Sequence, residues 1–212
     1  MQKSTIPFLL TSCLALVLVS CSPVNLVQDY KTAPVEKPVF QNTYFANPEI
    51  DYVYKANISV YGNELTGIFV AKKINETTHR VVFTTEFGNK LLDFEISDTE
   101  FKINSIVDEL NRKILINTLK DDFRLLLKKD FMVTEKYSKG TDEVVKSKDG
   151  KYFDYLFVST TDHKLYKIAQ VTKTKEKLSM SFTSENNIFA DKIVIQHYNL
   201  KLRIEFNYFK QN

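Results

Sequence analysis

The chain has 212 residues and a formal net charge of +3, with 29 basic against 26 acidic side chains. The two signs are interspersed, and the densest basic clusters are doublets such as Lys72-Lys73 and Lys128-Lys129, so the sequence lacks the basic stripe typical of nucleic-acid-binding proteins. Cys13 and Cys21 are the only cysteines, which excludes a fold held together by several disulfides or by a cysteine metal cluster.

The first twenty residues have the organisation of a secretory signal peptide. A positive charge at Lys3 precedes an apolar run from Ile6 to Val19, and the small residue Ser20 follows. A membrane-spanning helix needs about 20 apolar residues, so this run is too short to cross a bilayer and instead fits the apolar part of a signal peptide. We therefore expect residues 1–20 to be cleaved off.

The residues around the expected cleavage site resemble a bacterial lipobox, which has the pattern Leu18-Val19-Ser20-Cys21 here. The resemblance implies that Cys21 is lipidated, becomes the first residue of the mature protein and anchors it in membrane lipid. The alternative is an ordinary signal peptide with a chance cysteine. Ser22 follows the cysteine, which implies onward transport to the outer membrane in organisms that retain lipoproteins carrying aspartate at this position. The expected location is the cell envelope, with the membrane face left open.

The segment 21–48 is predicted to be a lipidated N-terminus and an extended tether. It contains four of the five prolines of the chain, and no proline follows residue 48. Proline favours extended conformations, and the segment has no sustained apolar period. A flexible chain of this length spans about 25 to 30 Å root mean square, so the domain expected at residues 49–212 could stand off the bilayer.

From residue 49 the pattern changes to short runs rich in aromatic and β-branched residues, separated by turn residues, which is typical of strands. Before the helix, the predicted strands are 52–61, 64–72, 79–87 and 90–97, with a further short strand at 100–103. After it, they are 131–137, 143–148, 151–159, 164–172, 177–185, 192–198 and 199–209. The connections are only a few residues long, which predicts antiparallel neighbours because parallel pairing needs a long crossover.

Between these two groups the apolar period becomes helical. Ser105 with Asp108 and Glu109 resembles a capping box and predicts the start of the helix, and Lys128-Lys129 suit its negatively polarised C-terminal end. The predicted apolar stripe consists of Ile106, Leu110, Ile114, Ile116, Leu119, Phe123 and Leu126. Only packing against the sheet would hide such a stripe from water.

Together these elements predict a single α+β domain that is mostly β. Its architecture is a strongly curved antiparallel sheet of about ten or eleven strands, an unclosed barrel with the internal helix as its plug, because open sheets of that size curl.

The residues that could carry catalysis or hold a metal are isolated. His79, His163 and His197 lack a second ligand at metal spacing, so we expect them to be structural or solvated. Asp121-Asp122 is expected to lie on a solvated helix face. No nucleophile motif or phosphate-binding loop is present in the sequence. We expect no enzyme activity, no metal and no cofactor.

The sequence has 16 phenylalanines and 11 tyrosines but no tryptophan. Two interpretations are open: a well-packed core, or an apolar cavity between the curved sheet and the helix, as in small barrels that hold one hydrophobic ligand. The candidate cavity-lining residues, chosen for their position on the apolar side of a strand or in the helix stripe, are Phe83, Leu92, Phe94, Leu119, Phe123, Phe182 and Ile204.

Three segments resemble the LolB-like group of outer-membrane lipoproteins. These are Val60 to Val70 with Gly67, Phe87-Gly88 followed by Leu91-Leu92, and the closing hairpin from Ile193 to Phe206. The chain departs from the better-known members because it has no tryptophan and no proline before Phe87. It is therefore similar to a looser LolB-like group rather than to those members themselves.

The resemblance implies an unclosed barrel with a helical plug that binds acyl chains, with a lipid or lipoprotein as cargo and a LolA-like periplasmic carrier as partner. It also implies that Phe87 is exposed at a strand tip, where it contacts the membrane. The alternative for Phe87 is burial beside Val81 and Phe83, which share its strand parity. The alternative for the whole protein is a structural or complex-forming lipoprotein with a filled core. No nucleic-acid partner is expected.

Overall fold

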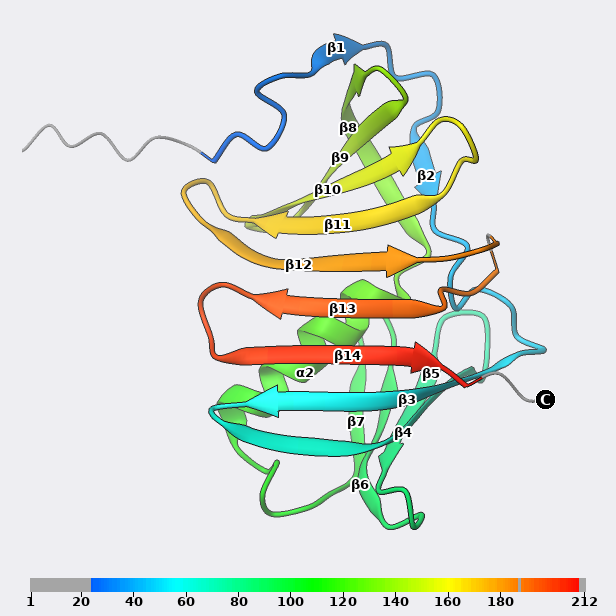
Figure 1. Ribbon diagram of the computed structural model, residues 1–212, viewed down its shortest axis with the longest axis vertical. Coiled ribbons are helices and arrows are strands. Elements are labelled where there is room, and N and C mark those ends of the chain that lie inside the picture. Colours follow the sequence, from blue (N-terminus) through cyan, green and yellow to red (C-terminus); the bar gives the residue numbers. More distant parts are fainter. Residues whose placement is uncertain (1–23, 187, 210–212) are drawn as a thin grey trace, which may run out of the picture.

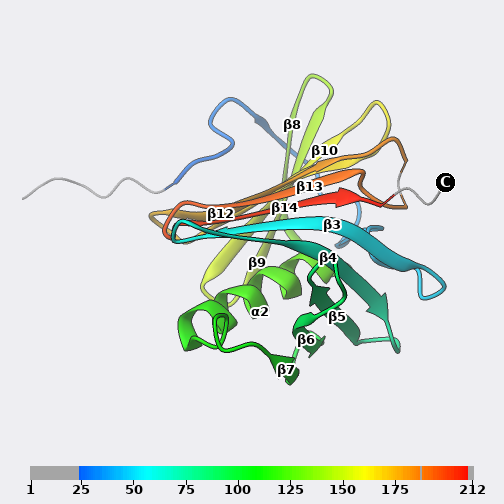
Figure 2. The same cartoon turned by 60° about the horizontal axis from the view of Figure 1, so that its bottom comes forward.

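The computed structural model describes residues 24–186 and 188–209, and its strands form one large antiparallel sheet. The sheet has fourteen strands in the order β1-β8-β9-β10-β11-β12-β13-β14-β3-β4-β5-β6-β7, and β2 pairs with β8 beside β1. Figure 1 shows the strands stacked along the long axis, and Figure 2 shows the helix α2 on one side of them. The elements are β1 (Lys31–Ala33), β2 (Val39–Gln41), β3 (Asp51–Val60), β4 (Asn63–Lys73), β5 (His79–Thr84), β6 (Lys90–Ile96), β7 (Phe101–Ile106), α2 (Lys113–Leu127), β8 (Asp130–Lys139), β9 (Asp142–Asp149), β10 (Tyr152–Ser159), β11 (Leu165–Val171), β12 (Glu176–Thr183), β13 (Lys192–His197) and β14 (Leu202–Tyr208).

The predicted fold class is confirmed. The sheet is curved and not closed, since β1 and β7 end the path of hydrogen-bonded strands, and one helix lies against it in the described part of the chain. The strand count is higher than the ten or eleven expected, and β1 and β2 come from the segment expected to be a tether. No helix within residues 24–186 and 188–209 is long and apolar enough to span a membrane.

The last strand, β14, links the C-terminal strands of the sheet to β3. β14 pairs with β13 on one side and with β3 on the other, with Ile204 opposite Ile195 and Ile58. Leu202, Ile204 and Phe206 are buried while the residues between them are more exposed, as the alternation of apolar and polar residues predicts.

The expectation of an extended tether over residues 24–48 is wrong. β1 and β2 both pair with β8, and Tyr44 and Phe45 are buried in the main core. Val27 lies in a second apolar cluster, on the face of β9, β10 and β11 that points away from α2. The proline-bearing segment therefore covers the edge of β8 that does not pair with β9, together with an apolar patch. The strand pairing and the apolar contacts both involve residues about 100 positions further along the chain, so the local sequence does not predict them.

The helix begins later than predicted. Ser105 belongs to β7, where it pairs with Asp93 of β6, so the proposed capping box is not formed. The helix starts at Lys113, after Arg112, which makes no side-chain cap hydrogen bond. The second half of the predicted stripe is confirmed, since Leu119, Phe123 and Leu126 are fully buried, whereas Ile114 is 57% exposed.

Candidate ligand-binding groove

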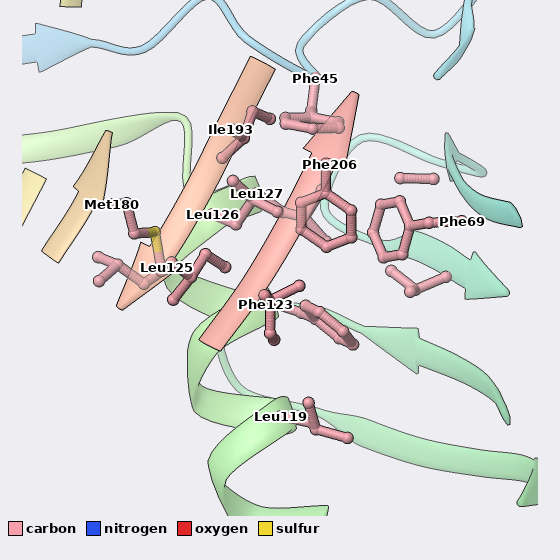
Figure 3. Packing of buried hydrophobic residues seen from close by; sticks show 14 of the residues in the cluster. Phe45, Phe69, Leu119, Phe123, Leu125, Leu126, Leu127, Met180, Ile193 and Phe206 are labelled. Atoms are coloured by element: carbon pink, nitrogen blue, oxygen red, sulfur yellow. The ribbon is translucent and has the colours of Figure 1, made fainter. Parts of the chain in front are cut away.

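The interior between sheet and helix is filled by side chains. Six of the seven candidate cavity-lining residues are fully buried, and Phe182 is 5% exposed. The Phe69 ring lies 5.4 Å from that of Phe123 and 4.4 Å from that of Phe206, measured between centroids, and Figure 3 shows these side chains together at the centre of the core.

Five surface hollows along the described residues have walls that include none of the six fully buried candidates, which are Phe83, Leu92, Phe94, Leu119, Phe123 and Ile204. Phe182 borders a small hollow near Tyr44. These residues are therefore core residues in this structure, and the ring contacts favour the packed-core interpretation over an interior cavity.

A groove instead opens at one end of the curved sheet, between the β3–β4 hairpin and the start of α2. We call this end the mouth and the groove the mouth groove. Its volume is about 630 Å³, within the range of roughly 300 to 1,000 Å³ typical of small-molecule sites. Its apolar walls are formed by Val60, Tyr61, Leu65, Leu110, Ile114 and Leu115. A small adjoining hollow is lined in part by Leu200 and Leu202, so the apolar surface continues toward β14.

The rim of the groove is polar. Glu64 and Asn63 lie on the hairpin side, and Glu109 and Arg112 lie on the segment that leads into α2. Leu110 and Leu115 are buried, whereas Tyr61 and Ile114 are about half exposed. An apolar floor with charged groups at its edge suits an amphipathic ligand, whose chain leaves water while its polar end stays at the rim.

The hairpin turn places Tyr61 at this mouth. Val60 pairs with Asn63, so Tyr61 and Gly62 form a two-residue turn, and both have positive φ, 50° and 89°. Asparagine and glycine fit this turn best, and a tyrosine in this conformation costs about 1 kcal/mol or more. The Tyr61 N–H donates to the Lys201 carbonyl at 2.9 Å, which stabilises the turn. A large aromatic residue at a strained turn position is the sequence signal that could have indicated the groove.

Phe87 lies at the tip between β5 and β6 and is 94% exposed. β5 ends at Thr84 after a register shift between Phe83 and Thr84, which breaks the parity that would have buried Phe87. The turn is held by the Gly88 N–H, which donates to the Thr85 carbonyl at 3.0 Å. The alternative that Phe87 is a core residue is wrong.

A buried polar pair lies under α2. His197 Nε2 and Asp122 Oδ2 are 2.7 Å apart, and both side chains have no exposed area. Burial raises the pKa of the Asp122 carboxyl above its ordinary value. Asp122 Oδ1 and His197 Nδ1 lack a hydrogen-bond partner within the described part of the chain. Asp122 is buried, so the expectation that it faces solvent is wrong. Its partner His197 lies in β13, 75 positions further along the chain, and the local sequence does not reveal it.

The other isolated groups have structural positions. His79 Nε2 is 2.9 Å from the Phe45 carbonyl in the core, which ties the N-terminal segment to β5, and His163 is exposed in a turn. Over residues 24–186 and 188–209 no group of three or more His, Cys, Asp or Glu side chains could hold a metal ion. Cys21 lies outside the described residues.

The structure confirms the unclosed antiparallel sheet that curves around one helix, which is the architecture expected from the LolB-like resemblance. No protein-family model and no curated protein sequence matches the chain.

Solved structures with a similar course of the chain include a LolA superfamily protein from Nitrosomonas europaea, with 8% identity and a TM-score of 0.48, over 78% of this chain and 87% of that one. An outer membrane lipoprotein-sorting protein domain from Vibrio parahaemolyticus has 7% identity and a TM-score of 0.44, over 76% and 83% of the two chains. These similarities concern the fold alone.

Proposed function

We propose that this protein is a lipoprotein anchored through Cys21 in the cell envelope, most simply in the outer membrane, and that its mouth groove binds an acyl chain of a lipid or lipoprotein. The observation that carries the proposal is the groove of about 630 Å³ with apolar walls and a charged rim. It differs from the expectation in one respect: the acyl chain is bound at the mouth, because the interior is filled. A LolA-like periplasmic carrier would be the donor of such cargo.

Ile114→Asp is expected to abolish or strongly weaken binding of a fluorescent fatty acid by the purified protein. Ile114 lines the groove and is about half exposed, and burial of an isoleucine side chain contributes about 1.5 to 3 kcal/mol, which corresponds to a loss of about tenfold to a hundredfold in affinity. An aspartate in the first turn of a helix is favourable, so the melting temperature should hold.

The matched control is Ile188→Asp, because Ile188 is 50% exposed against 57% for Ile114 and lies in the β12–β13 connection, outside the groove. Fluorescence titration should give this variant the affinity of the wild type. Equal affinities for the two variants would place any binding elsewhere and remove the groove from the proposal.

The second candidate is a structural or complex-forming lipoprotein without a ligand. The filled interior favours it, since the residues expected to line a cavity pack against one another. The same titration separates the two functions: a wild-type protein that binds no fatty acid supports the accessory role.

Phe87→Glu is expected to leave the melting temperature unchanged and to reduce binding of the protein to liposomes. An apolar side chain that is 94% exposed makes few contacts to lose, and surface substitutions usually change stability by no more than about 0.5 kcal/mol. Thermal unfolding and liposome flotation measure the two effects. A large drop in melting temperature would show that Phe87 packs against the domain, and unchanged flotation would remove its proposed membrane contact.

A further inference from the structure

The start of the described chain, from Val24, packs against one end of the sheet. The Val24 N–H donates to the Lys173 carbonyl in the β11–β12 turn at 3.2 Å. Val24, Leu26, Val27 and Tyr30 all pack with the second apolar cluster. Cys21 is only three residues before Val24, and three residues span at most about 11 Å. A lipid on Cys21 would therefore hold the β11–β12 turn close to the bilayer.

Several turns share this end of the strands. Tyr152 of β10 pairs with Asp149, and Phe153 pairs with Val171 at the end of β11. His197 at the end of β13 pairs with Leu178 at the start of β12. The turns at 148–151, 172–177 and 198–201 consequently form one row, which Figure 1 shows on the left, near the start of the described chain at Val24. We call this the lysine edge.

The lysine edge is basic. Its three turns hold two carboxylates, Asp149 and Glu176, against six lysines: Lys148, Lys151, Lys173, Lys175, Lys177 and Lys201. Asp149 is paired with Lys128 at 2.8 Å. Over the residues that the structure describes, Lys148, Lys173, Lys175 and Lys201 have no ion-pair partner and are exposed. The turns at the opposite ends, 139–142, 160–164 and 184–191, have two lysines against four carboxylates.

The edge also carries aromatic side chains. Tyr198 is 56% exposed at the β13–β14 turn, and the Lys177 ammonium lies 4.7 Å from the centroid of the Tyr152 ring. Lysine and tyrosine together are the residues that favour the headgroup region of a bilayer. The turn after Val60 continues the row, because Val60 pairs with Leu202, so the mouth groove opens at the same end.

We infer that the anchored domain docks with its lysine edge on the surface of a bilayer that contains anionic phospholipid, and that the mouth groove is thereby presented to the lipid. The inference rests on the proposed anchor at Cys21. The lysines bind the headgroup phosphates, and each basic residue near an anionic surface contributes about fivefold to the docked population. The short connection from Cys21 to Val24 selects this edge over the opposite one.

The test uses the full lipidated chain, reconstituted in vesicles of phosphatidylglycerol and phosphatidylethanolamine. Tyr198→Cys and Ile188→Cys each provide a labelling site at 56% and 50% exposure, on the lysine edge and on the opposite end of the strands. A fluorophore at residue 198 is expected to be quenched strongly by a lipid with a nitroxide headgroup, and one at residue 188 only weakly. Equal quenching at the two positions would overturn the inference.

Charge variants in the Tyr198→Cys background test the chemistry. Lys173→Gln with Lys175→Gln is expected to lower the ratio of docked to undocked protein about 25-fold, at about fivefold per lysine. Lys139→Gln with Lys192→Gln, two exposed lysines at the opposite end, should leave the quenching unchanged. Vesicles of phosphatidylcholine, which has no net charge, should give the same loss of quenching at residue 198. Quenching that changes neither with the two lysines nor with the lipid charge would overturn the electrostatic docking.

The anchor is tested separately by Cys21→Ala, which should release the protein from membranes because stable attachment needs the lipid. Unchanged membrane retention of this variant would overturn the proposed anchor. A wild-type protein that needs Cys21 for retention but shows equal quenching at residues 188 and 198 would overturn the docking alone.

Discussion

Phe123→Ala is expected to lower the free energy of unfolding by about 3 to 5 kcal/mol, the usual cost of truncating a fully buried phenylalanine. The Phe123 ring has no exposed area and lies 5.4 Å from the Phe69 ring, at the contact between α2 and the sheet (Figure 3). Neighbouring rings can relax only partly into the space, so the loss includes a cavity as well as contacts. Urea denaturation followed by circular dichroism measures the change.

The control on the same helix is Ile114→Ala, which should change the free energy of unfolding by about 0.5 kcal/mol or less, because Ile114 is more than half exposed. The result bears on function as well as stability. If Phe123→Ala were nearly neutral and the affinity for a fatty acid changed with it, the interior would be a ligand cavity after all, and the mouth groove would lose its role.

His197→Leu is expected to cost about 3 to 5 kcal/mol near neutral pH, because removal of one member of a buried pair leaves the other uncompensated. The Asp122 carboxyl has no exposed area, and within residues 24–186 and 188–209 its one hydrogen-bond partner is His197. Leucine fills much of the space of the imidazole, so the loss of stability comes mainly from the missing hydrogen bond to Asp122 and not from a cavity. Asp122→Leu with His197→Leu should recover most of the stability, since no buried charge remains. Equal losses in the single and double variants would assign the cost to packing instead.

The pH dependence of the His197→Leu variant has a defined sign. Burial raises the pKa of Asp122 in the folded protein above its ordinary value, so the folded state binds the proton more tightly than the unfolded state. Stability therefore decreases as pH rises from the ordinary aspartate pKa of about 4 toward the raised folded value. The His197 hydrogen bond lowers the pKa of Asp122 against this burial, so its loss raises that pKa further in the variant. The deficit of His197→Leu relative to wild type should therefore be smallest where the carboxyl is protonated in both folded proteins and grow as pH rises above the folded pKa of the wild type, which denaturation at a series of pH values would measure. A constant deficit would contradict the role assigned to the carboxyl.

A local apolar period is enough to predict the elements whose buried face follows that period. The alternation through Leu202, Ile204 and Phe206 predicts the buried face of β14, and the spacing of Leu119 and Phe123 predicts the buried face of α2, as the structure confirms. Short connections between such strands leave antiparallel pairing as the main possibility, so the curved sheet with its helix could be predicted before any coordinates.

Features that depend on partners far along the chain could not be predicted from local patterns. Ser105 could have capped a helix, but its pairing with Asp93 places it in β7. Asp122 could have faced water, but His197 of β13 meets it in the core. The proline-bearing segment could have been a tether, but β8 and the apolar cluster around Val27 hold it on the sheet. The capping preference of Ser105 is only about 1 kcal/mol. In all three cases non-local burial and hydrogen bonding outweigh the local preference, and the residues that provide them cannot be identified until the sheet is assembled.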